Sequence, residues 1–495
     1  MSLLGIDVGS TGCKAAAFAE SGACLGSAYR EYPTLQPGPG LAELDSQAVW
    51  GQIKDAIAEV VARTKGNPVS ALCACSMGEA MIPVAADGRL LAHSIMSSDV
   101  RGAETVAELR AKLGQREFYR LNPNILGTNY SLPKLRWIRD HQRALYDQTW
   151  KFLFWGDLVA FLLAGKPQTS RSYANRTLLF DIRRERWSEP LLALGGIARE
   201  KLPDIVADGA VVGTVAAAMA KELGLPAGVQ VVAGGHDQGY NSLGAGIYQA
   251  GKAVCGIGSY ECITPTYAGI PDDVDAMLAQ GLNIEHHVIP GLYVSFIYNQ
   301  AGMLVKWFRD TFAPGAEGAG LYDALAAEMP VAPTRLMTLP YFETTGSPEF
   351  VSDAAGVIAG LKTSHRRGDI LKSIMESSTY YFVDSLAALK AMGMDTSEFV
   401  ATGGGARSDP WLQIKADILG VPFVRPRITE CTVLGAAMLA GLGTKRFASP
   451  AEAVARFVQR DRVFTPDPGR HAIYVEQVEK YRRLFPLLRE YLRGL

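Results

Sequence analysis

Three glycine-rich segments hold the side chains of this sequence that are best placed to do chemistry. The first, residues 7–14, reads Asp-Val-Gly-Ser-Thr-Gly-Cys-Lys. The backbone amides of such a turn, with Ser10, Thr11 and Lys14, can hold phosphate oxygens, while Asp7 faces a magnesium ion. An ordinary β-hairpin with glycines at positive φ is the alternative. The segment is neither a Walker A loop nor a dinucleotide-binding Gly-x-Gly-x-x-Gly.

The second segment, residues 232–239, reads Val-Ala-Gly-Gly-His-Asp-Gln-Gly and places Asp237 just after an apolar strand. Ligands meet α/β sheets at strand ends, so a carboxylate there can accept a proton from an attacking hydroxyl group. The position also fits a helix cap that accepts hydrogen bonds from the first amides of a following helix. Taken alone, the segment leaves both roles open.

The third segment, residues 402–409, reads Thr-Gly-Gly-Gly-Ala-Arg-Ser-Asp between a predicted strand and a predicted helix. Three glycines remove side chains where a flat ligand such as a purine must lie against backbone, and the helix N-terminus adds partial positive charge. A flexible connecting loop is the alternative.

Regular elements must position these segments. Short apolar runs at Leu3–Val8, Lys14–Ala19 and Cys24–Tyr32, separated by glycine and serine, predict a three-stranded antiparallel start. Helical spacing of apolar residues over Ser46–Thr64, behind a serine that can cap it, predicts a helix, and Val69–Ser76 returns to strand. The unit is therefore predicted to be β-β-β-α-β.

A similar succession occurs in the second half of the chain, which predicts two similar α/β domains joined near residues 240–255, with a cleft between them. The expected elements there are a strand, a glycine turn and a strand over 251–265, a helix over 370–392, a strand over 398–402, a helix over 409–419 and a strand over 421–424.

The composition of the chain narrows its function class. At 495 residues it is too long for one ordinary core, and 49 Lys plus Arg against 50 Asp plus Glu lacks the charge excess of a nucleic-acid or anionic-membrane binder. The seven scattered cysteines are typical of reduced thiols and favour a cytoplasmic protein. The N-terminus does not resemble a secretory signal. The most apolar window, residues 152–165, is too short to span a bilayer and predicts a buried helix.

The three segments together, in this order, make the chain resemble the FGGY carbohydrate kinases over essentially its whole length. Intermediate segments at residues 129–137, 176–182 and 202–204 support the resemblance. It implies an α/β fold of two actin-like, ribonuclease-H-like domains with ATP and sugar in the cleft between them. We expect the N-terminal domain at 1–246 and the C-terminal domain at 247–495.

The resemblance also implies residue roles. Asp7 is similar to the acid that organises Mg²⁺, usually through water, and Asp237 to the catalytic base, with Gln238 beside it in the sugar site. The second phosphate loop reads Gly-Ser-Tyr where the family often has Gly-Thr-Ser or Gly-Thr-Gly. The expected ATP-binding residues are Ser10, Thr11, Lys14, Gly258, Ser259, Gly302, Gly404, Gly405 and Asp409.

The substrate side departs further from the family. Residues 77–80 read Met-Gly-Glu-Ala where xylulose kinases commonly show Gln-Met-His-Gly, and glycerol kinases have Arg-Glu there. A Trp-x-Asp-x-Arg pattern appears as Ser-Ser-Asp-Val-Arg at 97–101. Glu79, Asp99 and Asn129 are expected to contact the substrate, although solvated loop charge is the alternative for the two acids.

These observations predict an enzyme that uses ATP and Mg²⁺ to phosphorylate a hydroxyl of a small sugar. A pentulose such as D-xylulose is the first choice on its frequency in the family alone. The departures make glycerol a poor fit, because a site selects among polyhydroxy ligands by which hydroxyls find partners. Another ketose or polyol is the second choice. A non-catalytic nucleotide-binding protein or an actin-like ATPase is the alternative of another class. No nucleic-acid or membrane partner is expected, and a homodimer is left open.

Overall fold

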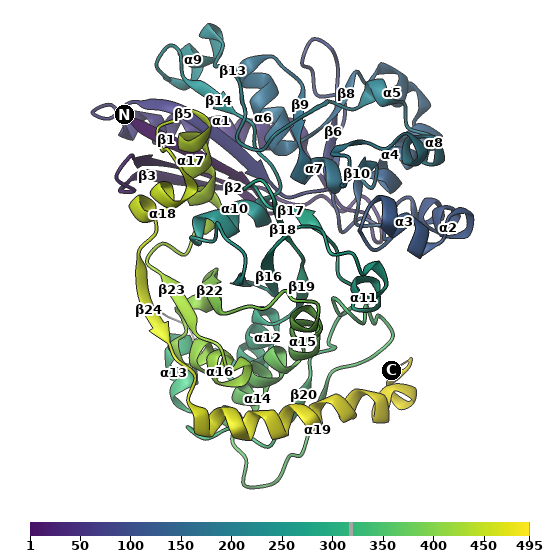
Figure 1. The fold of residues 1–495 in the computed structure, drawn as a ribbon, viewed down its shortest axis with the longest axis vertical. Helices are drawn as coiled ribbons and strands as arrows, with labels where there is room; N and C mark the ends of the chain where they lie inside the picture. Colours follow the sequence, from purple (N-terminus) through teal and green to yellow (C-terminus); the bar gives the residue numbers. More distant parts are fainter. Residues whose placement is uncertain (316–319, 495) are drawn as a thin grey trace.

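The computed structural model describes residues 1–315 and 320–494, which build two α/β lobes, each around one large sheet (Figure 1). The first lobe has a six-stranded sheet in the order β13-β14-β5-β1-β2-β3. β1 (Ser2–Val8) pairs antiparallel with β2 (Gly12–Ala19) and parallel with β5 (Val69–Ser76), and β3 (Cys24–Glu31) extends the hairpin. The predicted β-β-β-α-β order is thus confirmed. Beyond β5 the sheet continues with β14 (Gln230–Val232) and β13 (Val211–Thr214), so that β13 and β3 are its edge strands.

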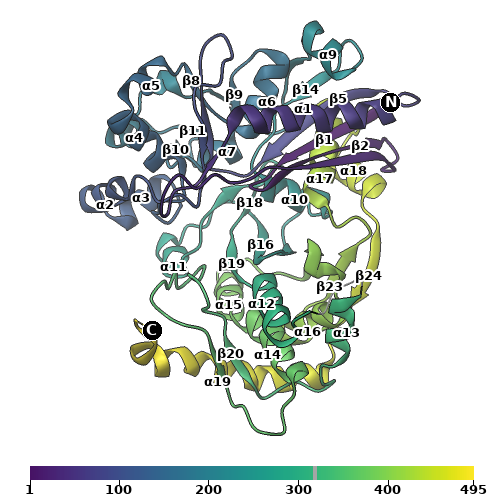
Figure 2. The ribbon, with the colours of Figure 1, turned by 180° about the vertical axis from the view of Figure 1, so that it is seen from behind.

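Two helices from opposite ends of the chain, α1 (Ser46–Arg63) and α17 (Cys431–Gly443), cover the first sheet (Figures 1 and 2). Successive residues of a strand point to opposite faces, so Leu4 and Ile6 of β1 pack in the cluster with α1, while Leu3 packs in the cluster with α17. A helix from the last part of the sequence therefore completes the core of the first lobe.

The second lobe repeats the hairpin with a parallel neighbour. Its sheet runs β17-β18-β16-β15-β22-β23-β24, with β19 also paired to β16. β15 pairs antiparallel with β16 and parallel with β22, as β1 does with β2 and β5. The strands are β15 (Lys252–Ile257), β16 (Tyr260–Ala268), β17 (Glu285–His286), β18 (Leu292–Val294), β19 (Ile297–Gln300), β22 (Glu398–Thr402), β23 (Phe423–Pro426) and β24 (Arg460–Phe464).

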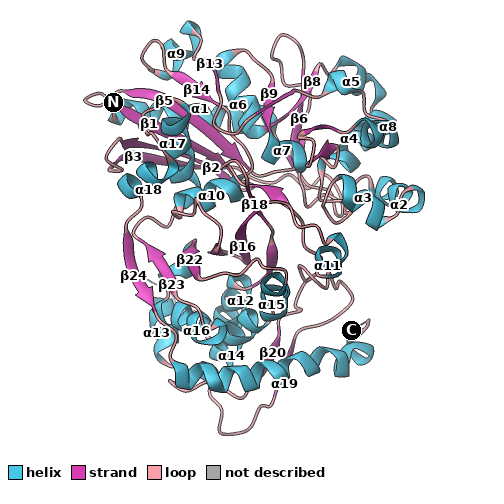
Figure 3. Ribbon diagram, viewed as in Figure 1, coloured by secondary structure: helices cyan, strands magenta, loops and turns pink. Residues whose placement is uncertain are grey.

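Helices and short strands surround both sheets (Figure 3). The remaining helices are α2 (Ala103–Lys112), α3 (Gln115–Leu121), α4 (Ser131–His141), α5 (Arg143–Gln148), α6 (Trp155–Ala164), α7 (Arg171–Asn175), α8 (Glu189–Gly195), α9 (Ala217–Leu223), α10 (Asp237–Gly244), α11 (Val274–Ala279), α12 (Gly302–Phe312), α13 (Leu321–Ala327), α14 (Arg367–Tyr380), α15 (Val383–Ala391), α16 (Asp409–Leu419), α18 (Pro450–Phe457) and α19 (Pro468–Leu492). The short strands are β4 (Glu43–Leu44), β6 (Met81–Val84), β7 (Ser94–Ile95), β8 (Lys151–Phe154), β9 (Gln168–Ser170), β10 (Phe180–Asp181), β11 (Arg186–Trp187), β12 (Asp204–Val206), β20 (Met337–Leu339) and β21 (Val357–Ala359). None of the helices in the described ranges has the length and apolarity to cross a membrane.

Several predicted local features were wrong. The helix expected over 370–392 is broken between α14 and α15, where Phe382 is fully buried. The helix expected over 152–165 begins as strand β8, because its first residues pair with β6. Asp45, and not Ser46, caps α1: its carboxylate accepts hydrogen bonds from the amides at 47 and 48, both at 3.0 Å.

Glycines let α10 and α17 cross at backbone contact. A Cβ added at Gly435 of α17 would lie 2.0 Å from the carbonyl oxygen of Tyr240, and one at Gly244 of α10 would lie 1.9 Å from that of Cys431. Because backbone atoms cannot yield as the end of a side chain can, the crossing requires glycine at both positions.

We predict that Gly435→Ala lowers the free energy of unfolding by about 3 kcal/mol, as expected when a rigid contact is overpacked. Gly51→Ala on α1 is the matched control, because no atom lies within 4 Å of the added Cβ. It should raise stability by roughly 0.5–1 kcal/mol through helix propensity. Denaturant unfolding of both variants measures the difference, and equal stabilities would contradict the role assigned to the crossing.

Candidate active site

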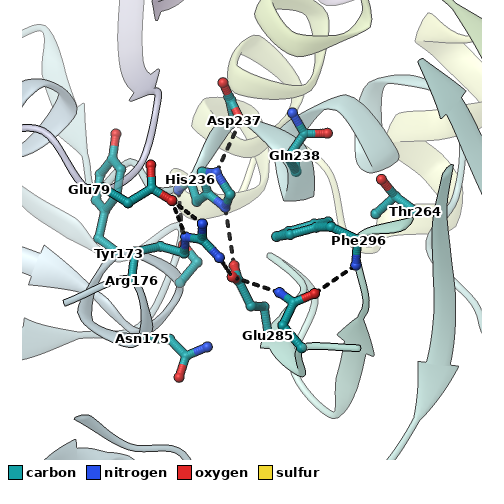
Figure 4. A network of polar contacts seen from close by, with 12 residues as sticks. Glu79, Tyr173, Asn175, Arg176, His236, Asp237, Gln238, Thr264, Glu285 and Phe296 are labelled. Atoms are coloured by element: carbon teal, nitrogen blue, oxygen red, sulfur yellow. Dashed lines mark hydrogen bonds and ion pairs between the residues drawn. The ribbon is translucent and has the colours of Figure 1, made fainter. Parts of the chain in front are cut away.

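A row of buried charged side chains crosses from the first lobe to the second (Figure 4). Arg176, just after α7, donates from Nε to Oε1 of Glu79 at 2.6 Å and from its terminal nitrogens to Glu79 and to Glu285 of β17. The guanidinium also lies over the rings of Tyr130, at 4.7 Å, and Phe296, at 5.7 Å. A buried arginine with two carboxylates and two aromatic faces is held in one orientation.

Glu79 is unusual in its backbone as well as its partner. It has φ of 67°, the left-handed region that side-chain-bearing residues rarely occupy. Its side chain is only 10 % exposed and points toward Arg176. The surface-charge alternative for Glu79 is therefore wrong. The predicted substrate contact remains a prediction, and Arg176 would fix the carboxylate for it.

Asp237 is the first residue of α10 and follows the short strand β14, two glycines and His236 in the chain. A Cβ at Gly234 would lie 1.6 Å from the carbonyl oxygen of Ala74, so glycine brings this strand end directly against β5. His236 occupies the N-cap position, and Oδ1 of Asp237 has no hydrogen-bond partner among the described residues. The helix-cap alternative is therefore wrong, and a buried oxygen is left available.

The surroundings of Asp237 raise the affinity of its carboxylate for a proton. Burial raises the pKa of Asp237, the charge of His236 lowers it, and the charge of Glu79 raises it. A carboxylate whose pKa is moved toward neutrality is a better general base than an exposed one. Gln238 lies beside Asp237, half buried, with its predicted sugar contact untested.

Asp7, at the end of β1, forms a second acidic position close to Asp237. Burial, and after it the charge of Asp237, raise the pKa of Asp7 to about 8. Within the described ranges no group of three or more His, Cys, Asp and Glu side chains is arranged to hold a metal ion. A cation near Asp7 would then need water or phosphate oxygens to complete its shell.

The residues of the first glycine turn lie around Asp7. Ser10 and Thr11 are exposed at the β1–β2 turn, and Lys14 of β2 forms an ion pair with Glu430 at 2.6 Å. Tyr32 Oη donates to the carbonyl oxygen of Gly9 at 2.6 Å and so holds the turn. These side chains are presented to solvent, as phosphate contacts require.

A cavity of about 1210 Å³ lies in the second lobe and gathers most of the other predicted nucleotide residues. Its wall includes Gly258 and Ser259 of the β15–β16 turn, Gly302 at the start of α12, and Gly404 and Gly405. A Cβ at Gly302 would lie 2.2 Å from the carbonyl oxygen of Gly258, which fixes how these two elements meet. The volume exceeds that of most small-ligand pockets, so a nucleotide fits.

Asp409 and Asn129 stand apart from these groupings. Asp409 begins α16 but is not part of the cavity wall, and its carboxylate pairs with Arg425, at 2.6 Å, and with Arg462. Asn129 is exposed in the loop that leads to α4. The ligand contacts predicted for both remain untested.

Asp99 differs from its predicted role. Its side chain has no exposed surface, and its oxygens accept from the amide of Ala42 at 2.7 Å, from the amide of Arg101 at 2.8 Å and from the guanidinium of Arg101. With both oxygens engaged, Asp99 orients Arg101 and has no free atom for a substrate. The surface-charge alternative for Asp99 is also wrong.

Sequence reasoning missed three residues of the charged row: Arg176, His236 and Glu285. Arg176 and His236 lie inside segments that the sequence singles out, but no role followed from their types. Glu285 gives only a weak signal, an acid after an apolar stretch. A lone buried charge in such a stretch predicts a partner without identifying it.

Comparison with known proteins bears on this arrangement. Residues 2–244 match the model described as "FGGY family of carbohydrate kinases, N-terminal domain", and residues 281–444 match that of the C-terminal domain. The chain is 27% identical over 487 residues to the xylulose kinase of Bacillus subtilis, covering 98% of this chain and 95% of that protein. It is 26% identical over 508 residues to the autoinducer-2 kinase of Escherichia coli K12, covering 98% and 94%. The crystal structure of xylulose kinase from Rhodospirillum rubrum matches with a TM-score of 0.90 at 28% identity, over 99% of this chain and 100% of that chain.

We predict that Asp7→Asn stabilises the ligand-free protein at pH 8–9 but not at pH 4. A carboxyl whose pKa is raised to about 8 in the folded state contributes its stability below pH 4 and loses it as pH rises toward 8, and asparagine avoids that loss. The melting temperature should rise by at least about 2 °C at alkaline pH, measured with a chelator present. Asp55→Asn, at an exposed position on α1, should show no such pH dependence. A gain that is equal at both pH values would contradict the burial of charge at Asp7.

Proposed function

The chain belongs to the FGGY family of carbohydrate kinases, and from this premise we propose that it transfers the γ-phosphoryl group of ATP to a hydroxyl of a small neutral sugar. Asp237 is the general base in this proposal. The observation that carries it is the buried Oδ1 of Asp237 at the start of α10, which accepts no hydrogen bond from the described residues and faces the imidazole of His236 at 3.4 Å. Asp237 is close enough to Asp7 for its charge to raise the pKa of that acid, and the charges of Glu79 and Arg176 act on Asp237 in turn.

A pentulose such as D-xylulose is the first candidate substrate. Support comes from relatives named xylulose kinase, which align over nearly the whole chain. A relative named autoinducer-2 kinase is 26% identical to this chain, against 27% for the xylulose kinase of Bacillus subtilis, so another ketose or polyol is the second candidate. The retained acids Asp7 and Asp237 argue against a non-catalytic relative.

The residues present fit Mg²⁺ and ATP. ATP supplies the phosphoryl group and Mg²⁺ neutralises the charge that builds up during its transfer. Asp7 would hold the cation through water, and Ser10, Thr11 and Lys14 would contact phosphate oxygens from the first lobe. Two nearby acids, one of them with its pKa raised by the other's charge, form a site that a cation stabilises. The glycine-lined cavity of the second lobe would take the rest of the nucleotide.

Asp237 then acts on the acceptor. It orients the sugar hydroxyl and takes its proton as the new O–P bond forms, which leaves a neutral carboxyl group. Gln238, Glu79 and Asn129 are the proposed sugar contacts. Residues 1–246 and 247–495 remain our proposed division into sugar-side and nucleotide-side domains.

The charge of the sugar side favours a neutral acceptor. Three carboxylates, on Glu79, Glu285 and Asp237, face this region, and the one guanidinium is already engaged by two of them. The cations of this row, Arg176 and His236, are already paired with these carboxylates, so an anionic sugar acid would be repelled by nearby like charge.

We predict that ADP release requires a sugar and is supported by neutral ketoses or polyols, with ketopentoses ahead, but not by gluconate. A coupled ADP assay over ketoses, aldoses, polyols and gluconate measures this. Release at the same rate without any sugar would identify an ATPase and contradict the proposal. Activity with gluconate above that with every neutral sugar would contradict the charge argument alone.

We predict that Asp237→Asn lowers kcat by roughly 10²- to 10⁴-fold, the usual contribution of a positioned general base, because asparagine keeps the size but cannot accept the proton. ATP binding should change by less than about threefold, since the nucleotide contacts are elsewhere. If Asp237 only favoured the helix N-terminus by its charge, the loss would be within about fivefold. A folded variant that keeps more than about a tenth of wild-type kcat excludes Asp237 as the base.

A further inference from the structure

His236 is the one member of the charged row that touches Asp237, and the proposed reaction does not yet use it. Its Nδ1 lies 3.1 Å from Oε2 of Glu285, and its Nε2 lies 3.4 Å from Oδ1 of Asp237. The side chain is 9% exposed, and its ring meets Phe296 edge-on with centroids 5.4 Å apart. The imidazole therefore sits between two carboxylates in a closed environment (Figure 4).

We propose that His236 is a positioning residue: Glu285 fixes the imidazole so that its Nε2 side aims the Asp237 carboxylate at the acceptor hydroxyl and keeps that carboxylate in its proton-accepting form. The inference rests on the proposed function, in which Asp237 is the base. The inference adds two residues, His236 and Glu285, and both act on the reaction only through Asp237.

Glu285 is itself rigidly held, which the proposal requires. Its Oε1 accepts from Arg176 and from Nδ2 of Asn283 at 2.9 Å, and Asn283 Oδ1 in turn accepts from the amide of Phe296 at 2.8 Å. Only Oε2 remains for His236. A carboxylate that is held through one oxygen can fix the orientation of a histidine ring with the other. Acidic residues hydrogen-bonded to functional histidines commonly play this part.

The segment that carries Glu285 is docked on the first lobe, where His236 also lies. Asn175 Nδ2 donates to the carbonyl oxygen of Ile284 at 2.9 Å, and the amide of Ile284 donates to the carbonyl oxygen of Pro123 at 2.9 Å. Tyr119 Oη donates to the carbonyl oxygen of Leu282 at 2.5 Å. The contact between Glu285 and His236 is thus built into one packed region.

The charges around His236 favour its protonated form. Facing it are Asp237 on its own helix, Glu285 on β17, Arg176 after α7 and, next to Arg176, Glu79. Burial lowers the pKa of His236, but the hydrogen bond with Glu285 and the charges of Asp237 and Glu285 outweigh it and leave the pKa raised. An imidazolium carries a proton on both nitrogens, so Nδ1 can donate to Glu285 while the protonated Nε2 faces Asp237 at 3.4 Å without forming a hydrogen bond in this structure.

The absence of a side chain at Gly78 is independent evidence that the packing leaves space for the imidazole ring of His236. A Cβ at Gly78 would lie 3.1 Å from Cδ2 of His236 and 3.0 Å from Cγ of Arg176. Both distances are tighter than ordinary contact, so a side chain here would press on two members of the row. The glycine in Met77-Gly78-Glu79 clears the space that His236 and Arg176 fill.

The test compares His236→Ala with His236→Gln. Glutamine can keep a neutral donor near Asp237, whereas alanine keeps none. We expect His236→Ala to lower kcat about 100-fold and His236→Gln about 10-fold, with the KM for ATP changed less than about threefold, as for a lost orientation of a reacting group. In both variants the acidic limb of the pH profile of kcat/KM should move upward by about one pH unit, because the neighbouring positive charge is lost.

A double variant separates this proposal from the proposed function. In the Asp237→Asn background, adding His236→Gln should lower kcat by no more than about twofold, since His236 acts only through Asp237. If Asp237→Asn alone keeps full activity, the proposed function has failed. If Asp237→Asn is inactive as expected but the His236→Gln single variant raises only the KM for sugar, or leaves the pH limb in place, the positioning role is overturned.

Two further variants guard against a loss of folding. Glu285→Gln should shift the acidic limb of the kcat/KM profile in the same way while the imidazole of His236 is still present. This variant replaces His236→Ala in the test if His236→Ala does not fold. Asp417→Asn is the matched control, because Asp417 is also a buried carboxylate paired with an arginine, Arg470, but lies on α16 of the second lobe. It should lower the melting temperature and leave the pH limb unmoved. If Asp417→Asn also shifted the acidic limb of the pH profile, general destabilisation would explain the effect, and the proposal would be overturned.

Discussion

The guanidinium of Arg176, buried between the carboxylates of Glu79 and Glu285, is the interaction on which the rest of the site depends. Two buried acids without a cation would be costly, and removing one partner of such a set typically costs about 3–5 kcal/mol. The charge of Arg176 and the hydrogen bond from His236 hold the pKa of Glu285 below its ordinary value despite burial. The ionised Glu285 can then hold His236, which faces Asp237. Charge compensation at Arg176 thus extends to Asp237, the proposed base, through side chains from both lobes.

Backbone packing gives this row a rigid frame. Asp237 begins α10, and α10 crosses α17 at glycines, while a Cβ at Gly5 of β1 would lie 2.0 Å from the carbonyl oxygen of Val433 in α17. The helix that carries Asp237 is therefore tied to β1, in which Asp7 is the residue before the last. The two acids keep their separation because backbone, with few soft torsions, sets it. A helix from the end of the chain thereby fixes a site formed by its first half.

The proposed nucleotide site in the second lobe and the proposed sugar site around Arg176 are built from different kinds of residues. The wall of the second-lobe cavity combines glycines with larger side chains such as Arg309 and Trp411, whereas the proposed sugar side consists mostly of charged side chains that pair with one another. Family membership accounts for the shared nucleotide chemistry. In the proposed function, substrate choice depends on the charged residues, because a buried polar group that meets no hydroxyl of the substrate is left unpaired. Relatives with different substrate names at nearly equal identity are expected from this division.

The sequence by itself determined the features that depend on neighbours in the chain. The first three strands, α1, the second hairpin and the helix after the third glycine segment follow from periodicity and turn residues, and the family follows from the order of the glycine segments. Only the tertiary structure decided which acids are engaged and by what. Arg176 meets Glu79 across 97 positions and Glu285 across 109, and Asp99 turned inward to Arg101. Local patterns encode backbone conformation, but pairing between distant charges depends on how whole elements pack, which no window of sequence contains.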